Sequence, residues 1–286
     1  MHAYLRQHPD IYMPAEKEQN HFATDLLPTE YPYRDPYIDR ENYMSLFAGA
    51  RDEKRVGETS VFHLYSKAAA ENIFAFNASS RIIIMLRDPV SWMASYHSQM
   101  VYNGDEVIAD LQGALDAEER RRRGKDIPEN LRFMQRLLYR DVVRFSGQVA
   151  RYLDRFGRDA VHIILQDDFA RNARAVFREA LDFLDVDPEF QPEFITENTN
   201  KTIRSMWLSN FLVRPPAWVA APVMALLPRT RRRNLRERIK TANAVTRERE
   251  PLDPALRNRL AAELRPDVDR LAELIGRDLS HWCAAS

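Results

Sequence analysis

Residues 81–96 read Arg-Ile-Ile-Ile-Met-Leu-Arg-Asp-Pro-Val-Ser-Trp-Met-Ala-Ser-Tyr. The continuous apolar run Ile82–Leu86 is typical of a buried strand in a parallel sheet. Asp88 and Pro89 then provide an N-cap and a first-turn proline, so a helix is expected to begin immediately. Arg87 would therefore lie at the carboxyl end of a strand, and the Ser95 hydroxyl would lie about two turns into the following helix.

The Arg87 junction has two interpretations. A guanidinium at the carboxyl end of a strand, beside a helix N-terminus, suits an anion, and most often a phosphate. An ordinary strand–helix junction with a surface arginine would show the same local pattern.

Length and composition favour one larger domain or two small ones, since the chain has 286 residues, 45% hydrophobic and 29% charged. Its 42 basic and 42 acidic side chains give a formal net charge of zero. Bulk attraction to nucleic acid is therefore not indicated, and an anion site has to be local. The single cysteine, Cys283, excludes an internal disulfide, and the seven histidines show no metal-ligand spacing, so no metal is expected.

The sequence shows no secretory signal and no apolar run of the roughly 20 residues that span a bilayer, which predicts a cytoplasmic protein. The most apolar candidate, residues 211–227, is interrupted by Arg214 and three prolines and is expected to form short amphipathic helices. A basic run follows at residues 229–240 and is expected to be a solvated helix. Weak contact of residues 211–240 with a membrane surface is the lesser alternative.

Expected strands and helices alternate along the chain. A second apolar run, Val161–Leu165, predicts another buried strand, followed by a helix over Phe169–Leu184. Between the strands, the sequence predicts a charged, solvated helix over Glu106–Arg123 and one long amphipathic helix over residues 131–156. This order predicts an α/β fold of three layers, in which helices flank a mostly parallel sheet. We expect a single domain over 1–286, with an α/β core in 1–205 and a helical part in 206–286.

Residues 81–96, with the pattern R-[DN]-P-x5-S-x-Y after a strand, resemble the 3′-phosphate-binding segment of sulfotransferases. These enzymes use 3′-phosphoadenosine 5′-phosphosulfate (PAPS) as co-substrate, and their equivalents of Arg87 and Ser95 hold its 3′-phosphate. The resemblance implies a sulfotransferase fold like that of phosphate-binding-loop NTPases. It also implies transfer of a sulfuryl group that leaves adenosine 3′,5′-bisphosphate.

Two later segments extend this resemblance. Residues 198–205, Asn-Thr-Asn-Lys-Thr-Ile-Arg-Ser, resemble the family segment N-x-S-x-x-x-R-S that folds over the nucleotide. Lys201 or Arg204 would then complete the phosphate clamp, for which a bidentate guanidinium is well shaped. The alternative is a helix start with Arg204 exposed. Residues 252–282 resemble the closing helix of the family, a packing feature to which we assign no chemistry.

Residues 8–22, His-Pro-Asp-Ile-Tyr-Met-Pro-Ala-Glu-Lys-Glu-Gln-Asn-His-Phe, resemble the family pattern H-P-x-[IV] followed by K-E-x-x-[FH]-F. The glutamate of that pattern is the proposed general base in heparan-sulfate-type and many bacterial members. Carried over, Glu18 takes the proton from the acceptor, and Lys17 offers positive charge to the sulfuryl oxygens. Without the resemblance, a loop ion pair is the favoured interpretation. His21 and His63 are weaker candidates for the base, because cytosolic-type members use a histidine.

Residues 57–60, Gly-Glu-Thr-Ser, resemble the segment G-E-[KS]-[ST]-P-x-Y that lines the acceptor cleft of the family. Thr59 and Ser60, together with His21, are therefore candidates for acceptor binding. Val61 and Phe62 stand where the family commonly has proline and a small residue, so no catalytic duty follows.

One part of the family pattern does not occur in the sequence: the P-x-K-x-G-T-T loop, which holds the 5′-phosphosulfate. The chain begins inside the helix that should follow this loop, and no glycine precedes Gly49. We therefore expect the family fold to be N-terminally incomplete here. Either the start lies further upstream or the chain is a truncated relative.

The sequence as a whole predicts a bacterial-type, PAPS-dependent sulfotransferase that acts on a hydroxyl or amine of a carbohydrate, lipid or small molecule. The alternative is a truncated, non-catalytic relative that binds a nucleotide or glycan. A nucleotide kinase of the related fold would need G-x4-G-K-[ST], which the sequence does not contain. Neither the acceptor nor the oligomeric state is indicated.

Overall fold

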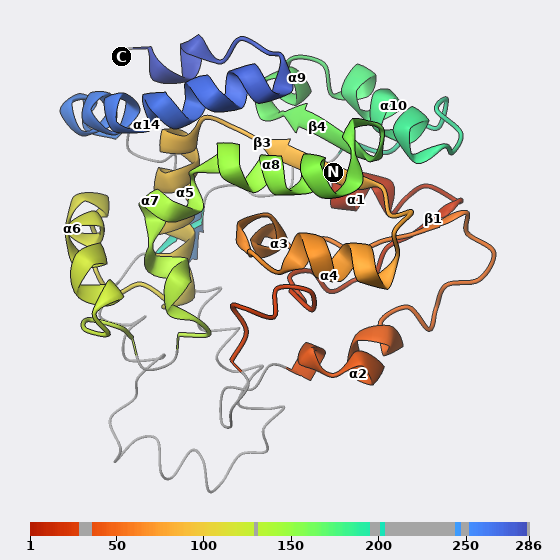
Figure 1. The fold of residues 1–286 in the computed structure, drawn as a ribbon, viewed down its shortest axis with the longest axis horizontal. Coiled ribbons are helices and arrows are strands. Elements are labelled where there is room, and N and C mark those ends of the chain that lie inside the picture. The colour runs from red at the N-terminus through yellow and green to blue at the C-terminus, as the bar shows by residue number, and fades with distance from the viewer. Residues whose placement is uncertain (29–35, 129–130, 195–200, 204–243, 247–251, 285–286) are drawn as a thin grey trace, which may run out of the picture. The chain divides into compact units, whose positions relative to one another are not determined.

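The computed structural model describes residues 1–28, 36–128, 131–194, 201–203, 244–246 and 252–284 (Figure 1). Contacts divide the chain into two compact units. The first contains residues 1–91, 140–195 and 257–286, and the second contains residues 92–139 and 196–256.

Parallel strand pairs organise the first unit. Strands β3 (Ile82–Leu86) and β4 (Val161–Leu165) pair over five residues, with Ile82 opposite Val161 and Leu86 opposite Leu165. A shorter parallel pair joins β1 (Ile11–Tyr12) to β2 (Arg55–Val56). Both strands predicted from apolar runs are thus confirmed, and the fold class is α/β as expected.

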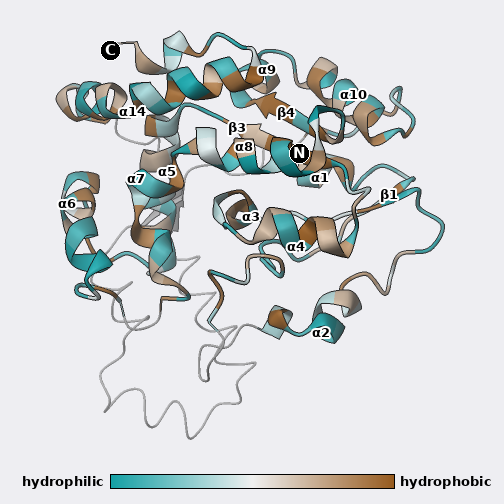
Figure 2. Cartoon of the chain, viewed as in Figure 1, coloured by the Kyte–Doolittle hydropathy of each residue, from teal (hydrophilic) through white to brown (hydrophobic). Residues whose placement is uncertain are grey.

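Helix α10 (Ala173–Leu184) covers one face of the β3–β4 pair (Figure 1). Its apolar face packs Val176 and Ala180 against Ile83 and Ile164. Side chains alternate between the two faces of a strand, so Val161 and Leu165, both buried, point to the opposite face. Helix α8 (Phe145–Phe156) also contacts β4. The mixed colouring of α10 in Figure 2 reflects its one buried, apolar face.

The sequence predicts one helix over Phe169–Leu184, but the structure has two, α9 (Gln166–Arg171) and α10. The break lies at Asn172, whose side chain accepts a hydrogen bond from the Ala175 amide at 3.1 Å. This is an N-cap, which satisfies a donor that the first turn of a helix leaves open. Asp185 ends α10 in the left-handed conformation, with φ of 56°.

We expect Asn172→Ala to lower the free energy of unfolding by about 1 kcal/mol, because the cap of α10 is lost. Asn172→Asp keeps an oxygen acceptor and is the matched control, with little expected change. Urea unfolding of the three proteins tests this, and equal stability of the alanine and aspartate variants would contradict the assigned cap.

The prediction of one long helix over residues 131–156 is wrong, because the structure has three short elements in this range. They are η2 (Met134–Leu137), α7 (Tyr139–Val142) and α8. Gln148 donates to the carbonyls of Asp141 and Val142 at 3.2 and 3.0 Å. Carbonyls at the end of a helix lack partners within it, so these bonds stabilise the end of α7.

Short helices complete the first unit. They are α1 (His2–Leu5), η1 (Pro36–Ile38), α2 (Arg40–Ser45), α3 (Val61–Tyr65), α4 (Ala69–Phe76), η3 (Arg158–Ala160) and η4 (Ser280–Cys283). The long helix α14 (Pro254–Ile275) confirms the closing helix predicted from the sequence. Arg151 on α8 donates to the carbonyls of Leu64, Tyr65 and Ser66, and so fixes the end of α3.

The second unit contains most of α5 (Pro89–Asn103), whose start confirms the predicted strand–helix junction, and α6 (Leu111–Arg122). It also contains an antiparallel pair, β5 (Lys201–Ile203) and β6 (Ala244–Thr246). The helix expected over Glu106–Arg123 begins only at Leu111, because Asp110 caps it by accepting from the Gly113 amide at 2.6 Å.

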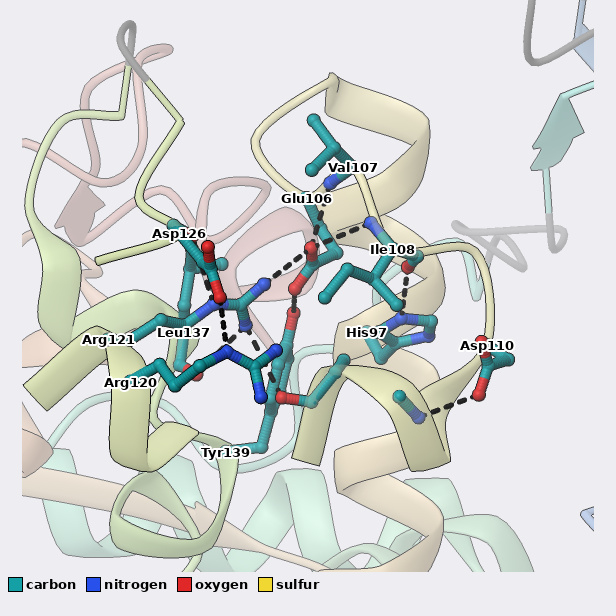
Figure 3. A network of polar contacts seen from close by, with 12 residues as sticks. His97, Glu106, Val107, Ile108, Asp110, Arg120, Arg121, Asp126, Leu137 and Tyr139 are labelled. Atoms are coloured by element: carbon teal, nitrogen blue, oxygen red, sulfur yellow. Dashed lines mark hydrogen bonds and ion pairs between the residues drawn. The ribbon is translucent and has the colours of Figure 1, made fainter. Parts of the chain in front are cut away.

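A buried ion pair holds this second unit together (Figure 3). Arg121 donates to Glu106 Oε1 at 2.8 Å, and both side chains are 0% exposed. The Tyr139 hydroxyl donates to Glu106 Oε2 at 2.8 Å, and the amides of Val107 and Ile108 donate to Oε1. The prediction of a solvated helix is therefore wrong at Arg121, whose side chain is buried against Glu106, whereas Arg123 is exposed.

Candidate functional site

A cavity of about 290 Å³ lies at the carboxyl edge of the β3–β4 pair in the first unit. Arg87 directly follows β3, and Gln166 directly follows β4. Neighbouring parallel strands end at the same edge of a sheet, and ligands of open α/β sheets bind at that edge. The lining residues are Arg87, Asp88, Ser91, Gln166, Asp167, Ala170, Arg257, His281 and Trp282.

The Arg87 guanidinium is half-buried, and it makes no hydrogen bond or ion pair with any residue that the structure describes. Burial lowers its pKa, and the negative charges of Asp88 and Asp167 oppose that shift. Arginine stays charged in proteins, so the cavity contains a fixed cation. Such a guanidinium can donate two parallel hydrogen bonds to a phosphate.

Asp88 does not neutralise Arg87, because its oxygens have other partners. It caps α5 by accepting from the Val90 amide at 2.9 Å, and it accepts from the Ser91 hydroxyl at 2.5 Å. Arg257, on α14, donates to the same carboxylate at 3.0 Å. Arg257 therefore offsets the charge of Asp88, while Asp167 remains as a second carboxylate on the cavity wall.

Asp167 is tied to the C-terminal segment. It accepts from Trp282 Nε1 at 2.7 Å and from His281 Nε2 at 3.0 Å. Burial raises the pKa of Asp167, but the hydrogen bonds from Trp282 and His281 outweigh burial and hold it below its ordinary value. Trp282, at the end of the segment 252–282 that was predicted to be a packing feature, is 2% exposed and also fixes this carboxylate at the cavity wall.

Of the residues predicted to bind the nucleotide, only some can be located relative to the cavity. Arg87 lines the cavity, whereas Ser95, one turn beyond Ser91 on α5, is not among the lining residues. The side chain of Lys201 on β5 and the whole of Arg204 lie outside the described residues, as does the expected membrane-contact segment 211–240.

Sequence reasoning missed Ser91, Gln166, Arg257 and His281 as lining residues. For Ser91 a local signal existed, since it precedes Ser95 by four residues and shares its helix face. Arg257 gave no such signal, because it meets Asp88 across 169 residues of sequence.

The predicted catalytic and acceptor residues come together in a second place in the first unit. The Glu18 amide donates to the Thr59 carbonyl at 3.0 Å, and the Glu18 carboxylate accepts from the Val61 amide at 3.0 Å. The Ser60 hydroxyl accepts from the Asn20 amide at 3.0 Å. The Glu18 segment and residues 59–61 are therefore in direct contact, and their roles as base and acceptor-binding residues stay predictions.

Lys17 and His21 flank this site. Lys17 is exposed, and Glu18 is half-buried. His21 stacks on Tyr43 with ring centroids 4.1 Å apart, and its Nδ1 donates to the Tyr37 carbonyl. His63, the other weaker candidate for the base, is buried, and burial lowers its pKa to about 3.

The Arg87 guanidinium, which has no hydrogen-bond partner among the described residues, thus lies at the carboxyl edge of parallel strands, where open α/β sheets bind their ligands. Among solved structures, the chain is similar to a sulfotransferase from Alicyclobacillus acidocaldarius, with a TM-score of 0.71 and 30% sequence identity. The match covers 99% of this chain and 92% of that one. The chain belongs to the sulfotransferase family.

A second similar structure is the sulfotransferase domain from the curacin biosynthetic pathway, with a TM-score of 0.36 and 15% identity. That match covers 84% of this chain and 68% of the other. No family model matches the sequence, and no curated protein matches it.

Among the described residues, no group of three His, Cys, Asp or Glu side chains is placed to hold a metal ion. None of the helices in the described part of the chain is long and apolar enough to cross a membrane.

Proposed function

We propose that this chain binds PAPS and transfers its sulfuryl group to a hydroxyl or amine of a carbohydrate, lipid or small-molecule acceptor in the cytoplasm. The observation that carries the proposal is the half-buried guanidinium of Arg87 at the carboxyl edge of β3 and β4, which has no hydrogen-bond partner within the described part of the chain. In the proposed complex Arg87 binds the nucleotide 3′-phosphate. Ser95, Lys201 and Arg204 complete the phosphate contacts.

Glu18 is the general base in this proposal. The acceptor oxygen or nitrogen attacks sulfur, the bond from sulfur to the 5′-phosphate oxygen breaks, and the acceptor proton passes to the Glu18 carboxylate. Adenosine 3′,5′-bisphosphate leaves with the electron pair of that bond. The Val61 amide donates to the Glu18 carboxylate at 3.0 Å and so orients this carboxylate for its role as base. Lys17 stabilises the charge that develops on the sulfuryl oxygens.

The acceptor side of the proposed site contains His21, Thr59 and Ser60. The Thr59 hydroxyl makes no hydrogen bond to a described residue, so it is open to an acceptor hydroxyl. The Ser60 hydroxyl already donates to Glu58 at 2.8 Å and therefore holds the site together more than it offers a donor.

We expect Arg87→Ala to weaken the binding of adenosine 3′,5′-bisphosphate by about 2 kcal/mol, because a charged hydrogen-bond partner of the phosphate is lost. Isothermal titration calorimetry measures this directly. Arg174→Ala is the matched control, since Arg174 is exposed on α10 and does not line the cavity. An unchanged affinity in Arg87→Ala would contradict the proposed phosphate site.

Binding without transfer is the second outcome to consider. If the nucleotide binds at Arg87 and no alcohol or amine accepts sulfate, the chain is a non-catalytic nucleotide- or glycan-binding relative.

A further inference from the structure

A buried carboxylate–histidine pair lies behind the Glu18 site. Glu58 Oε1 is 3.1 Å from Nδ1 of His63, and the two side chains are 10% and 11% exposed. The other oxygen of Glu58 accepts from the Ser60 hydroxyl at 2.8 Å. The pair has no role in the mechanism proposed above, although buried polar pairs of this kind cost free energy to desolvate.

The pair is linked to Glu18 through Ser60. The Ser60 hydroxyl bridges the Asn20 amide to Glu58, and the neighbours of Ser60 in sequence, Thr59 and Val61, bind the backbone and the carboxylate of Glu18. Both Glu18 and Asn20 adopt left-handed backbone conformations, with φ of 65° and 56°. Residues other than glycine keep such conformations only where their surroundings hold them, and here residues 58–61 do so.

The two carboxylates have different environments. Burial raises the pKa of Glu58 to about 7; the Ser60 hydrogen bond opposes the shift, and the charge of Glu18 adds to it. Burial also lowers the pKa of His63, so the pair is favoured as a neutral acid and a neutral imidazole below pH 7. Tyr43 and Tyr152 also face Glu58, and burial raises the pKa of both phenols, which keeps them neutral.

We propose that Glu58 is a positioning residue for Glu18. As a neutral acid, Glu58 joins Ser60 to His63, holds the Glu18 turn against residues 59–61, and places no second negative charge beside Glu18. A base that such contacts hold in a fixed geometry is well placed to take the acceptor proton. This inference rests on the proposed role of Glu18 as the base.

Infrared difference spectroscopy between pH 6 and pH 8 tests the protonation of Glu58 without an acceptor. We expect the carbonyl band of a protonated carboxylic acid to disappear as the pH rises through about 7, and to be absent in Glu58→Gln. Glu18→Gln removes the like charge, so the midpoint should move to lower pH. Glu41→Gln, at an exposed position, should leave the spectrum unchanged. A band that persists in Glu58→Gln, or a midpoint unmoved in Glu18→Gln, would overturn the inference.

The positioning role has its own readout. Glu58→Ala should lower kcat by about 10- to 100-fold, because a displaced base loses catalytic geometry. Glu58→Gln, which keeps both hydrogen bonds, should recover most of that loss. Both variants should bind adenosine 3′,5′-bisphosphate as the wild type does. Equal loss of kcat in the two variants would overturn the positioning role. A wild type that binds no nucleotide would count against the proposed function, while the infrared shift would still decide whether Glu18 and Glu58 are coupled.

Discussion

Glu18→Gln is expected to lower kcat for sulfuryl transfer by about 10²- to 10⁴-fold, the usual contribution of a general base. Glutamine has nearly the same shape and still accepts a hydrogen bond from the Val61 amide, but it cannot take the acceptor proton. The measurement is the release of adenosine 3′,5′-bisphosphate from PAPS, with an alcohol or amine acceptor that the wild type uses.

A matched control for this variant lies two residues away. Glu16 is exposed and its carboxylate has no partner among the described residues, so Glu16→Gln should keep wild-type turnover. Nucleotide affinity should be the same in both variants, because neither residue lines the Arg87 cavity. If Glu18→Gln retained full turnover, another group would have to be the base.

The second large effect concerns stability. Arg121→Met is expected to lower the free energy of unfolding by about 3–5 kcal/mol, because it leaves the Glu106 carboxylate buried without its counter-charge. Both side chains are fully buried, so water cannot replace the missing partner. Urea unfolding followed by circular dichroism measures the change.

Two comparison variants separate the ion pair from a general effect of losing an arginine. Arg123→Met removes an exposed arginine of the same run, whose side chain is 71% exposed, and should cost about 0–1 kcal/mol. The double variant Glu106→Gln/Arg121→Met should be less destabilised than Arg121→Met alone, because no bare charge remains. Equal stability of Arg121→Met and Arg123→Met would contradict the assigned pair.

Local sequence signals were sufficient for the strand–helix junction at Arg87. A five-residue apolar run, an aspartate cap and a first-turn proline act over neighbouring residues, and β3 and α5 follow them. The second apolar run gave β4 for the same reason. Helix continuity was less predictable, because Asn172 and Gln148 end or begin helices through single side-chain bonds that periodicity does not register.

The surroundings of the site depend on contacts between distant residues. Trp282 reaches Asp167 across 115 positions, and Arg257 reaches Asp88 across 169, so neither has a local pattern. The arginine run 120–123 likewise has no local pattern that distinguishes its members. Of these four arginines only Arg121 is buried, because it forms an ion pair with Glu106, which also accepts a hydrogen bond from Tyr139. The resemblance at residues 57–60 did not indicate that Glu58 is buried against His63.

The most direct test of the account compares two nucleotides on two proteins by calorimetry. Adenosine 3′,5′-bisphosphate and adenosine 5′-monophosphate differ in the 3′-phosphate alone, which Arg87 is proposed to bind. We predict that the wild type prefers the bisphosphate by about tenfold or more, as expected for a charged hydrogen-bonded pair, and that Arg87→Ala loses this preference. The same preference in both proteins, or none in the wild type, would contradict the account.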